Sequence, residues 1–204
     1  MYPVLKRVLD FTVSLTACLL TLPLLLGITV CIRLTTGSPV LFRQRRPGQQ
    51  GKPFYMLKFR TMRNLHPGEA AAETDAVRIT ALGRFLRSSS LDELPTLLNV
   101  LRGDISLVGP RPLLMQYLDR YTPAQARRHE VRPGITGWAQ INGRNAISWE
   151  QKFKLDVWYV DHRSFVLDLK ILFLTASKVL KREGISHAGE ATMAEFMGTK
   201  KGEK

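Results

Sequence analysis

Cysteine and metal-ligand patterns are scarce in this sequence of 204 residues. Its two cysteines, Cys18 and Cys31, both lie in an apolar stretch, where a cysteine usually serves as a small buried hydrophobic side chain. A disulfide at that spacing along one helix is geometrically implausible, and a reducing compartment fits. The four histidines are scattered, and no Cys/His pair has zinc-ligand spacing, which argues against a zinc site.

Acidic residues are also few. Seventeen Asp and Glu stand against thirty Lys and Arg, which leaves a net charge of +13 and a pI of about 10.2. The expected partners are therefore anions: phosphate-bearing ligands, acidic lipid or nucleic acid. One block of basic residues has no acidic residue within it, and its members are Arg33, Arg43, Arg45, Arg46, Lys52, Lys58, Arg60 and Arg63.

Charge is absent altogether from Phe11 to Ile32. As a straight helix this segment would extend about 33 Å, close to the ~30 Å hydrocarbon core of a bilayer. No small-residue cleavage site with a polar start follows it, so a signal peptide is a poor fit. Lys6 and Arg7 precede it and the basic block follows it, which places both flanks in the cytoplasm.

Pro23 stands at the middle of this apolar segment. Its ring and missing N–H disrupt a helix, so we expect a re-entrant membrane helix that is broken near Pro23. The hydroxyl of Thr16 or Thr21 could satisfy the carbonyl that is freed. A kinked spanning helix is the alternative interpretation.

The rest of the chain predicts one predominantly helical α/β domain that is associated with the membrane through amphipathic interfacial helices. We assign residues 1–35 to the anchor, 36–186 to this domain and 187–204 to a C-terminal tail, and we expect the chain after Gly184 to be poorly ordered. A small β-hairpin is expected from 39–43 and 53–59, and a mobile loop over 64–78. Helices are expected at 82–86, 91–101, 112–121, 123–130, 148–161 and 165–181.

Two adjacent carboxylates, Asp92 and Glu93, follow Arg87-Ser-Ser-Ser-Leu and precede Leu-Pro95. Ser90-x-x-Glu93 matches a capping box, in which both acids would only stabilise the start of a helix. Pro95 shifts the expected N-cap towards Asp92, because its missing N–H is tolerated only in the first turn. A helix start also offers free N–H groups to a phosphate, so the same pattern indicates an anion site.

Four motifs of the chain are Lys58–Met62, Arg87–Pro95, Gly103–Pro112 and Arg132–Asn145. Together they resemble the bacterial monotopic phosphoglycosyl transferases of the bacterial sugar transferase family. The resemblance extends from about Leu5 to Phe196, and the tail resembles the small members that use UDP-diacetylbacillosamine. The family's helix is broken at a Ser-Pro pair, where this chain has Leu22-Pro23.

The resemblance implies a ping-pong reaction at the cytoplasmic face of the bacterial inner membrane. Asp92 would attack the β-phosphorus of a UDP-sugar and release UMP, and undecaprenyl phosphate would then take the sugar phosphate from Asp92. Mg²⁺, with Asp92 as a ligand, and the arginines would neutralise the phosphates. Glu93 would assist by positioning or by proton transfer.

The resemblance also implies a set of binding residues. Arg87 and Arg111 would hold phosphate, and Lys58 and Asp156 match further family positions. Lys58 could instead belong only to the basic flank, and Asp156 could be an exposed helix acid. The loop Arg132–Asn145 is expected to contact nucleotide or sugar, or simply to form turns. The site residues expected within it are Arg132, Gln140 and Arg144.

The partners implied are a UDP-sugar, undecaprenyl phosphate and inner-membrane phospholipid, with homo-oligomerisation left open and nucleic acid not expected. Two other classes remain as alternatives. A membrane-tethered, non-enzymatic binder of acidic lipid or nucleic acid would account for the charge but gives the Asp-Glu pair no task. A conventional glycosyltransferase would release UDP, but the sequence lacks a spaced Asp-x-Asp metal motif.

Overall fold

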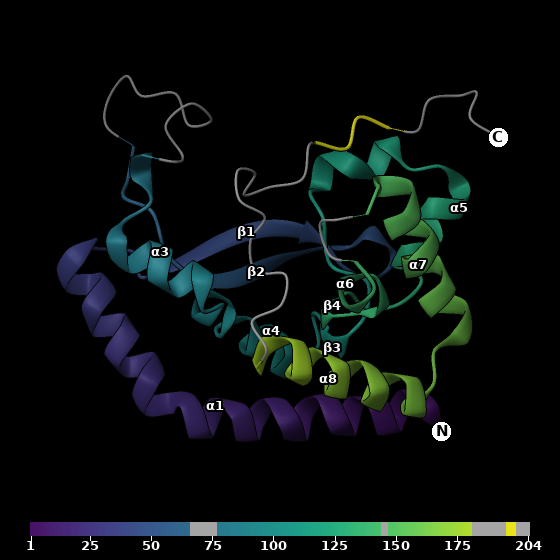
Figure 1. The fold of residues 1–204 in the computed structure, drawn as a ribbon, viewed down its shortest axis with the longest axis horizontal. Helices are drawn as coiled ribbons and strands as arrows, with labels where there is room; N and C mark the ends of the chain where they lie inside the picture. Colours follow the sequence, from purple (N-terminus) through teal and green to yellow (C-terminus); the bar gives the residue numbers. More distant parts are fainter. Residues whose placement is uncertain (66–76, 144–146, 181–194, 199–204) are drawn as a thin grey trace.

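The computed structural model describes residues 1–65, 77–143, 147–180 and 195–198. Helices predominate, and a long N-terminal helix, α1 (Tyr2–Thr35), runs along one side of the body formed by the rest of the chain (Figure 1). The expected α/β class with mainly helical content and a small antiparallel hairpin is confirmed. Residues 66–76 of the loop predicted at 64–78, and most of the predicted tail, lie outside the described residues.

Helix α1 is not interrupted at Pro23, its one internal proline. Figure 1 instead shows α1 bending partway along its length, so the chain changes direction while remaining helical. The Thr21 hydroxyl donates to the Ala17 carbonyl at 2.7 Å. Of the two hydroxyls considered, Thr16 and Thr21, that of Thr21 therefore does not satisfy the carbonyl freed by the proline, since that carbonyl belongs to Leu19.

The first part of α1 packs against the body through polar side chains. Asp10 is 2% exposed and accepts hydrogen bonds from the Ser106 hydroxyl and the Leu107 N–H, both at 3.0 Å. Arg7 donates to the carbonyls of Val100 and Leu101 at 2.6 and 2.7 Å, at the end of the helix that contains them. These contacts attach the N-terminal part of α1 firmly to the body.

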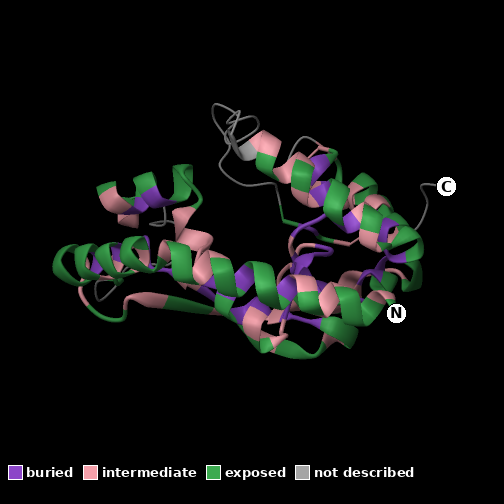
Figure 2. Ribbon diagram, turned by 90° about the horizontal axis from the view of Figure 1, so that it is seen from below, coloured by how far each residue is buried: buried purple, intermediate pink, exposed green. Residues whose placement is uncertain are grey.

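The last part of α1 packs against the same body through apolar side chains. Ile28 and Ile32 are buried in a cluster with Phe59 and Leu86. Between the attached parts, α1 exposes a run of large apolar side chains, including Leu19, Leu22 and Leu26 (Figure 2). Both ends of α1 are therefore joined to one body, and its middle presents an apolar surface.

The predicted hairpin is confirmed as β1 (Leu41–Pro47) paired antiparallel with β2 (Pro53–Phe59). The strands are connected by the 3-10 turn η1 (Gln49–Gly51), and β1 is longer than expected. Residues two apart on a strand share a face, so the pairing puts Gln44 and Arg46 on one face of β1 and Arg45 on the other.

Strand β2 is secured by polar side chains of α4 (Thr96–Arg102). Thr96 donates to the Leu57 carbonyl at 2.9 Å. The buried Asn99 accepts from the Leu57 N–H at 3.0 Å and donates to the Tyr55 carbonyl at 2.8 Å. These bonds satisfy backbone groups that a two-stranded sheet leaves open, and they hold the start of α4 beside β2. Helix α4 ends at Gly103, whose φ of 89° suits glycine, as expected.

A second sheet was not predicted from the sequence. β3 (Ser106–Val108) pairs in parallel with β4 (Gly134–Thr136), inside the loop motif after Arg132. A Cβ on Gly134 would lie 2.1 Å from the Gly109 nitrogen, so glycine permits this close approach. Strands of three residues are too short to show an alternating pattern in sequence.

The remaining elements follow the predictions only in part. The helix at Ala81–Ser88 is longer than the predicted 82–86, and the predicted helices at 91–101 and 123–130 are each divided into a short α-helix and a 3-10 turn. A 3-10 segment, η3 (Met115–Arg120), replaces the expected helix at 112–121. The predicted capping box of Ser148 and Gln151 is confirmed at the start of the helix Trp149–His162. The other elements are α3 (Ala81–Ser88), η2 (Leu91–Glu93), α5 (Pro123–Ala126), η4 (Arg127–His129), α6 (Trp138–Ile141), α7 (Trp149–His162) and α8 (Phe165–Leu180).

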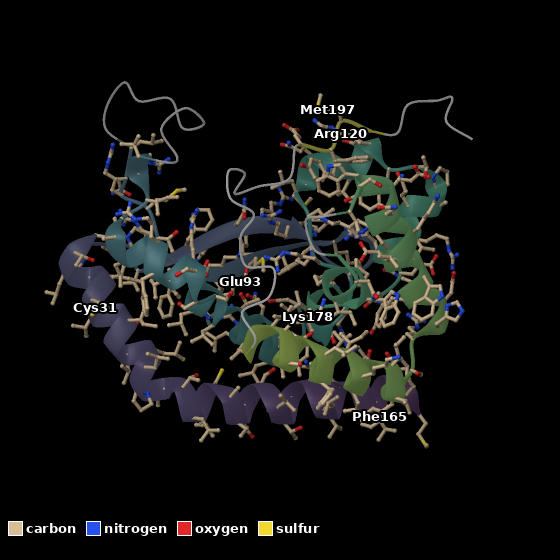
Figure 3. All side chains as sticks on the ribbon, in the orientation of Figure 1. Cys31, Glu93, Arg120, Phe165, Lys178 and Met197 are labelled. Carbon is tan, nitrogen blue, oxygen red and sulfur yellow. The ribbon has the colours of Figure 1, made fainter. Side chains whose placement is uncertain are left out.

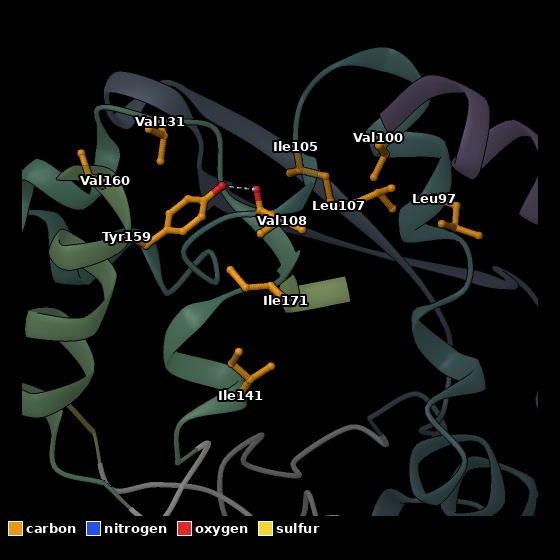
Figure 4. Close-up of a cluster of buried hydrophobic side chains, with 10 residues drawn as sticks. All are labelled: Leu97, Val100, Ile105, Leu107, Val108, Val131, Ile141, Tyr159, Val160 and Ile171. Atoms are coloured by element: carbon orange, nitrogen blue, oxygen red, sulfur yellow. Dashed lines mark hydrogen bonds between the residues drawn. The ribbon is translucent and has the colours of Figure 1, made fainter. Parts of the chain in front are cut away.

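The main core lies where α4, α7, α8 and the parallel strands meet (Figure 4). Tyr159 is 1% exposed there, and its hydroxyl donates to the Val108 carbonyl at 3.3 Å. Helix α8 buries Ile171 but exposes Val166 and Phe173, so it both covers the core and adds to the apolar surface. The buried members are Leu97, Val100, Ile105, Leu107, Val108, Val131, Ile141, Tyr159, Val160 and Ile171.

Candidate functional site

A cavity of about 1550 Å³ opens between the hairpin, η2 and α7. Its size exceeds that of a typical small-molecule pocket, so it has room for a nucleotide-sized ligand. Three carboxylates line it, from Asp92, Glu93 and Asp156. The basic residues that line it are Arg43, Arg46, Lys58, Arg60, Arg63, Arg78, Arg87, Arg111, Arg128 and Lys152.

Glu93 lies near the centre of the molecule (Figure 3) and bridges two cations. Its Oε1 is 2.6 Å from the Lys58 Nζ and 2.6 Å from the Arg111 Nη2. Burial alone would raise the pKa of Glu93, but Arg111 and Lys58 outweigh it and hold that pKa well below its usual range. Glu93 is therefore a fixed anion, and Lys58 belongs to the site and not only to the basic flank.

Asp92 differs sharply from its neighbour. Among the described residues, no side chain donates a hydrogen bond to its carboxylate or pairs with it as an ion pair. Burial, and then the charge of Glu93, raise the pKa of Asp92, while Lys58 and Arg87 oppose the shift. Adjacent carboxylates whose pKa values are shifted in opposite directions indicate different tasks. Of the two, Asp92 is the carboxylate that remains available to a ligand.

The local backbone shows that these acids do not form a helix cap. Ser90 has a φ of 57° and makes no side-chain capping bond, so the capping-box interpretation is wrong. The N-cap does not shift to Asp92 either, because Asp92 lies in the 3-10 turn η2 and α4 begins after Pro95. A left-handed conformation is uncommon for serine, and such residues gather at functional sites.

Arg87 is held at the cavity by a contact with Thr61, which follows strand β2 in the sequence. Its Nε donates to the Thr61 hydroxyl at 2.9 Å. Gly83, one turn earlier in α3, lies so close that a Cβ would be 2.0 Å from the Thr61 carbonyl oxygen. The absence of a side chain at Gly83 therefore lets α3 approach and brings Arg87 to the cavity.

Asp156 belongs to the site through a partner that the sequence did not reveal, Arg128. Both side chains are 1% exposed, so the interpretation of Asp156 as an exposed acid is wrong. The Arg128 Nε and Nη2 lie 3.0 and 2.7 Å from one Asp156 oxygen, and Nη2 also donates to the Arg111 carbonyl at 2.8 Å. The other Asp156 oxygen is buried without a hydrogen-bond partner among the described residues. Burial raises the pKa of Asp156, against the effect of Arg128.

The structure brings together seven of the nine residues predicted for the site: Lys58, Arg87, Asp92, Glu93, Arg111, Gln140 and Asp156. Gln140, from α6, has amide atoms that are buried and lack partners among the described residues, which leaves them available for a ligand. Arg132 is exposed and does not line the cavity. Arg144 lies outside the described residues.

Residues 1–182 match the bacterial sugar transferase family, and the chain belongs to it. The chain is 58% identical to the uncharacterized sugar transferase EpsL of Bacillus subtilis, over 96% of this chain and 97% of that one. It is 43% identical to the UDP-glucose:undecaprenyl-phosphate glucose-1-phosphate transferase of Caulobacter vibrioides, over 86% of this chain and 69% of the relative. The family resemblance of the motifs is thus confirmed.

Some relatives are longer than this chain and are similar to it over only part of their length. The enzyme of the same name from Xanthomonas campestris pv. campestris is 41% identical over 88% of this chain, but the match covers 39% of that protein. The similarity to this relative is therefore confined to part of its length.

Proposed function

We propose that the chain is a phosphoglycosyl transferase, which moves a sugar 1-phosphate from a UDP-sugar to undecaprenyl phosphate and releases UMP. The observation that carries this proposal is the contrast between Asp92 and Glu93 in a cavity lined mainly by cations. Relatives named for this reaction with UDP-glucose support the assignment of substrates.

The chemistry follows from the two carboxylates. An Asp92 oxygen attacks the β-phosphorus, and the bond from that phosphorus to the UMP oxygen breaks, with its electron pair leaving on UMP. An oxygen of undecaprenyl phosphate then attacks the same phosphorus, and the Asp92 oxygen leaves as carboxylate. Lys58, Arg87 and Arg111 reduce the repulsion between the carboxylate and the phosphates. Glu93 positions Lys58 and Arg111, and its low pKa suits this task better than proton transfer.

A Mg²⁺ ion fits the residues present. Among the described residues, no three Asp, Glu, His or Cys side chains gather as a complete metal site. Mg²⁺ at phosphate-transfer sites takes only one or two carboxylates and completes its shell with phosphate and water, and Asp92 is a carboxylate without a competing cation in contact. Asp92 would hold the ion, which would neutralise phosphate charge when bound.

Trapping the intermediate tests the reaction. The full chain in lipid nanodiscs is incubated with Mg²⁺ and a UDP-sugar labelled in the sugar, without acceptor lipid. We expect label on the protein together with an equal release of UMP, neither of which occurs with Asp92→Asn, while Glu93→Gln keeps slower labelling. UDP as the nucleotide product, or transfer to lipid by Asp92→Asn at the wild-type rate, would refute the proposal.

The donor sugar is a separate question. The tail resembles enzymes that use UDP-diacetylbacillosamine, and we propose an N-acetylated donor of this kind, although several relatives are named for glucose or galactose. Labelling rates with UDP-diacetylbacillosamine, UDP-N-acetylglucosamine and UDP-glucose at equal concentration decide the matter. Preference for UDP-glucose would overturn the assignment.

We propose further that α1 enters and leaves the cytoplasmic leaflet of the inner membrane from one side. Its 34 residues are long and apolar enough to cross a membrane, but its first and last parts both contact the same body, which supports a re-entrant path. Cysteines placed at Met1 and Thr36 in a variant without Cys18 and Cys31 test it. Neither should react with an impermeant maleimide added outside intact cells, and labelling of one alone would indicate a span.

A further inference from the structure

Arg46, on β1, is a cation of the cavity with which no described carboxylate forms an ion pair. It lines the cavity, yet it forms no ion pair within 4.0 Å with any described acidic residue. Its Nη2 donates to Gln44 at 2.6 Å, which orients the guanidinium, and its Nε is buried without a hydrogen-bond partner among the described residues. A buried, oriented donor without an acceptor is costly unless a ligand supplies one.

The charges around Arg46 favour an anionic ligand. Burial, and then the charge of Arg111, lower the pKa of Arg46 to about 10, so it remains protonated at neutral pH while crowded by a like charge. Glu93 acts in the opposite direction but is already bonded to Lys58 and Arg111. An anion between Arg46 and Arg111 would relieve the repulsion and bond both guanidinium groups.

The ion pairs of the cavity narrow the identity of that anion. Arg111 pairs with Glu93, the neighbour of Asp92, at 2.6 Å, whereas the Arg46 guanidinium bonds Gln44 and pairs with neither acid among the described residues. Arg111 is thus the arginine attached to the Asp92-Glu93 pair, and Arg46 is left for a second group. The phosphate under attack must contact Asp92, so the anion at Arg46 is a neighbouring phosphate.

We propose that Arg46, oriented by Gln44, forms with Arg111 a single phosphate subsite that holds the departing UMP phosphate and then the phosphate of the acceptor lipid. This rests on the proposed function. In an in-line displacement, the leaving oxygen lies opposite the attacking oxygen. Asp92 attacks in the first step and departs in the second, so the leaving group of the first step and the attacker of the second occupy the same place. No redox change or additional reactant is required.

The test uses Arg46→Gln and Arg46→Lys, with Arg45→Gln as the matched control. Arg45 is adjacent, exposed, on the opposite face of β1 and absent from the cavity wall. Wild type and variants in nanodiscs are loaded with labelled sugar phosphate, freed of nucleotide, and discharged with UMP or with undecaprenyl phosphate over a range of concentrations.

We expect Arg46→Gln to raise the half-saturating concentration of both compounds roughly tenfold to a hundredfold, the usual effect of losing a charge-assisted hydrogen bond. Arg46→Lys should show a smaller increase for both, because it keeps the charge but loses the planar donor geometry. Arg45→Gln should match wild type. An effect on UMP but not on undecaprenyl phosphate, or on neither, overturns the shared subsite.

Direct binding separates this proposal from the reaction itself. Titration calorimetry with UMP on the full, unloaded chain does not depend on a covalent intermediate. If wild type never accepts label, the proposed function fails, but weaker UMP binding by Arg46→Lys than by Arg45→Gln still supports a phosphate subsite. Equal UMP affinity in wild type and Arg46→Lys overturns it, even if Arg46→Gln does not fold.

Discussion

Arg128 and Asp156 form an ion pair in which both side chains are 1% exposed and the Arg128 Nη2 lies 2.7 Å from the Asp156 oxygen. Arg128 comes from η4 and Asp156 from α7, so the pair joins two elements that form one wall of the cavity. Through its bond to the Arg111 carbonyl, Arg128 also fixes the loop that carries a phosphate-binding candidate. The pair therefore connects the packing of the domain to the geometry of the site.

Breaking this pair should destabilise the protein strongly. We expect Arg128→Gln to lower the free energy of unfolding by about 3–5 kcal/mol, because it leaves a buried carboxylate without its partner. Arg128→Met combined with Asp156→Leu should lose less, since no buried charge remains. Denaturant unfolding in detergent measures both, and losses that add simply across the two positions would contradict the coupling.

The first half-reaction should depend on pH through Asp92. Its pKa is raised and its deprotonated form is the nucleophile, so labelling should decline on lowering the pH at values above the ordinary Asp pKa of about 3.9. Arg87→Gln removes a cation that lowers this pKa, so the midpoint should move to higher pH.

The pH profile of labelling in quench-flow experiments provides the measurement. Arg84→Gln is the control, because Arg84 is an exposed residue of the same helix and does not line the cavity. A midpoint that moves equally in both variants, or to lower pH in Arg87→Gln, would contradict the assigned electrostatics.

Gly83→Ala should reduce activity although residue 83 is not proposed to contact the substrate. The new Cβ would lie 2.0 Å from the Thr61 carbonyl oxygen, so α3 must shift and Arg87 must lose its bond to the Thr61 hydroxyl. We expect labelling to slow roughly tenfold to a hundredfold, as small displacements of positioning groups do. Gly27→Ala in α1, where a Cβ meets nothing within 4 Å, should retain the wild-type rate.

The described tail segment should contribute to stability through Phe196, which is 4% exposed and packs against Tyr117, Tyr121, Trp149 and Phe153. Phe196→Ala should lower the free energy of unfolding by up to about 3 kcal/mol, the lower part of the range for a buried Phe. Met197→Ala is the control, because Met197 is 75% exposed (Figure 3) and should have an effect within about 0.5 kcal/mol. Equal unfolding curves would show that the segment does not stabilise the domain.

The tail also illustrates where sequence reasoning is weak. The composition after Gly184 led us to expect poor order, and this is wrong for Glu195–Gly198. Arg120 bonds both the Glu195 carboxylate and the Phe196 carbonyl, at 2.8 and 2.5 Å. A single aromatic residue in a polar tail gives no periodic signal, and its docking depends on a cluster that only the folded chain assembles.

The sequence by itself determined the features that depend on local chemistry. A charge-free run determined the apolar helix, turn residues between apolar runs determined the hairpin, and Ser148 with Gln151 determined the start of α7. The family motifs were enough to indicate Asp92 and Glu93 as a pair. They could not assign the two acids different electrostatic roles, because adjacent residues of the same charge look equivalent in a sequence.

Only the tertiary structure decided that difference, because a pKa depends on which charges and how much protein surround a group. It placed Lys58 and Arg111 on Glu93, left Asp92 without a side-chain partner in the part of the chain that the structure describes, and supplied Arg128 to Asp156 from 28 positions away. It also revealed Arg46 as a cavity cation among many similar residues of the basic block. Sequence specifies the charges, whereas their energies follow from distances and burial that arise only when the chain folds.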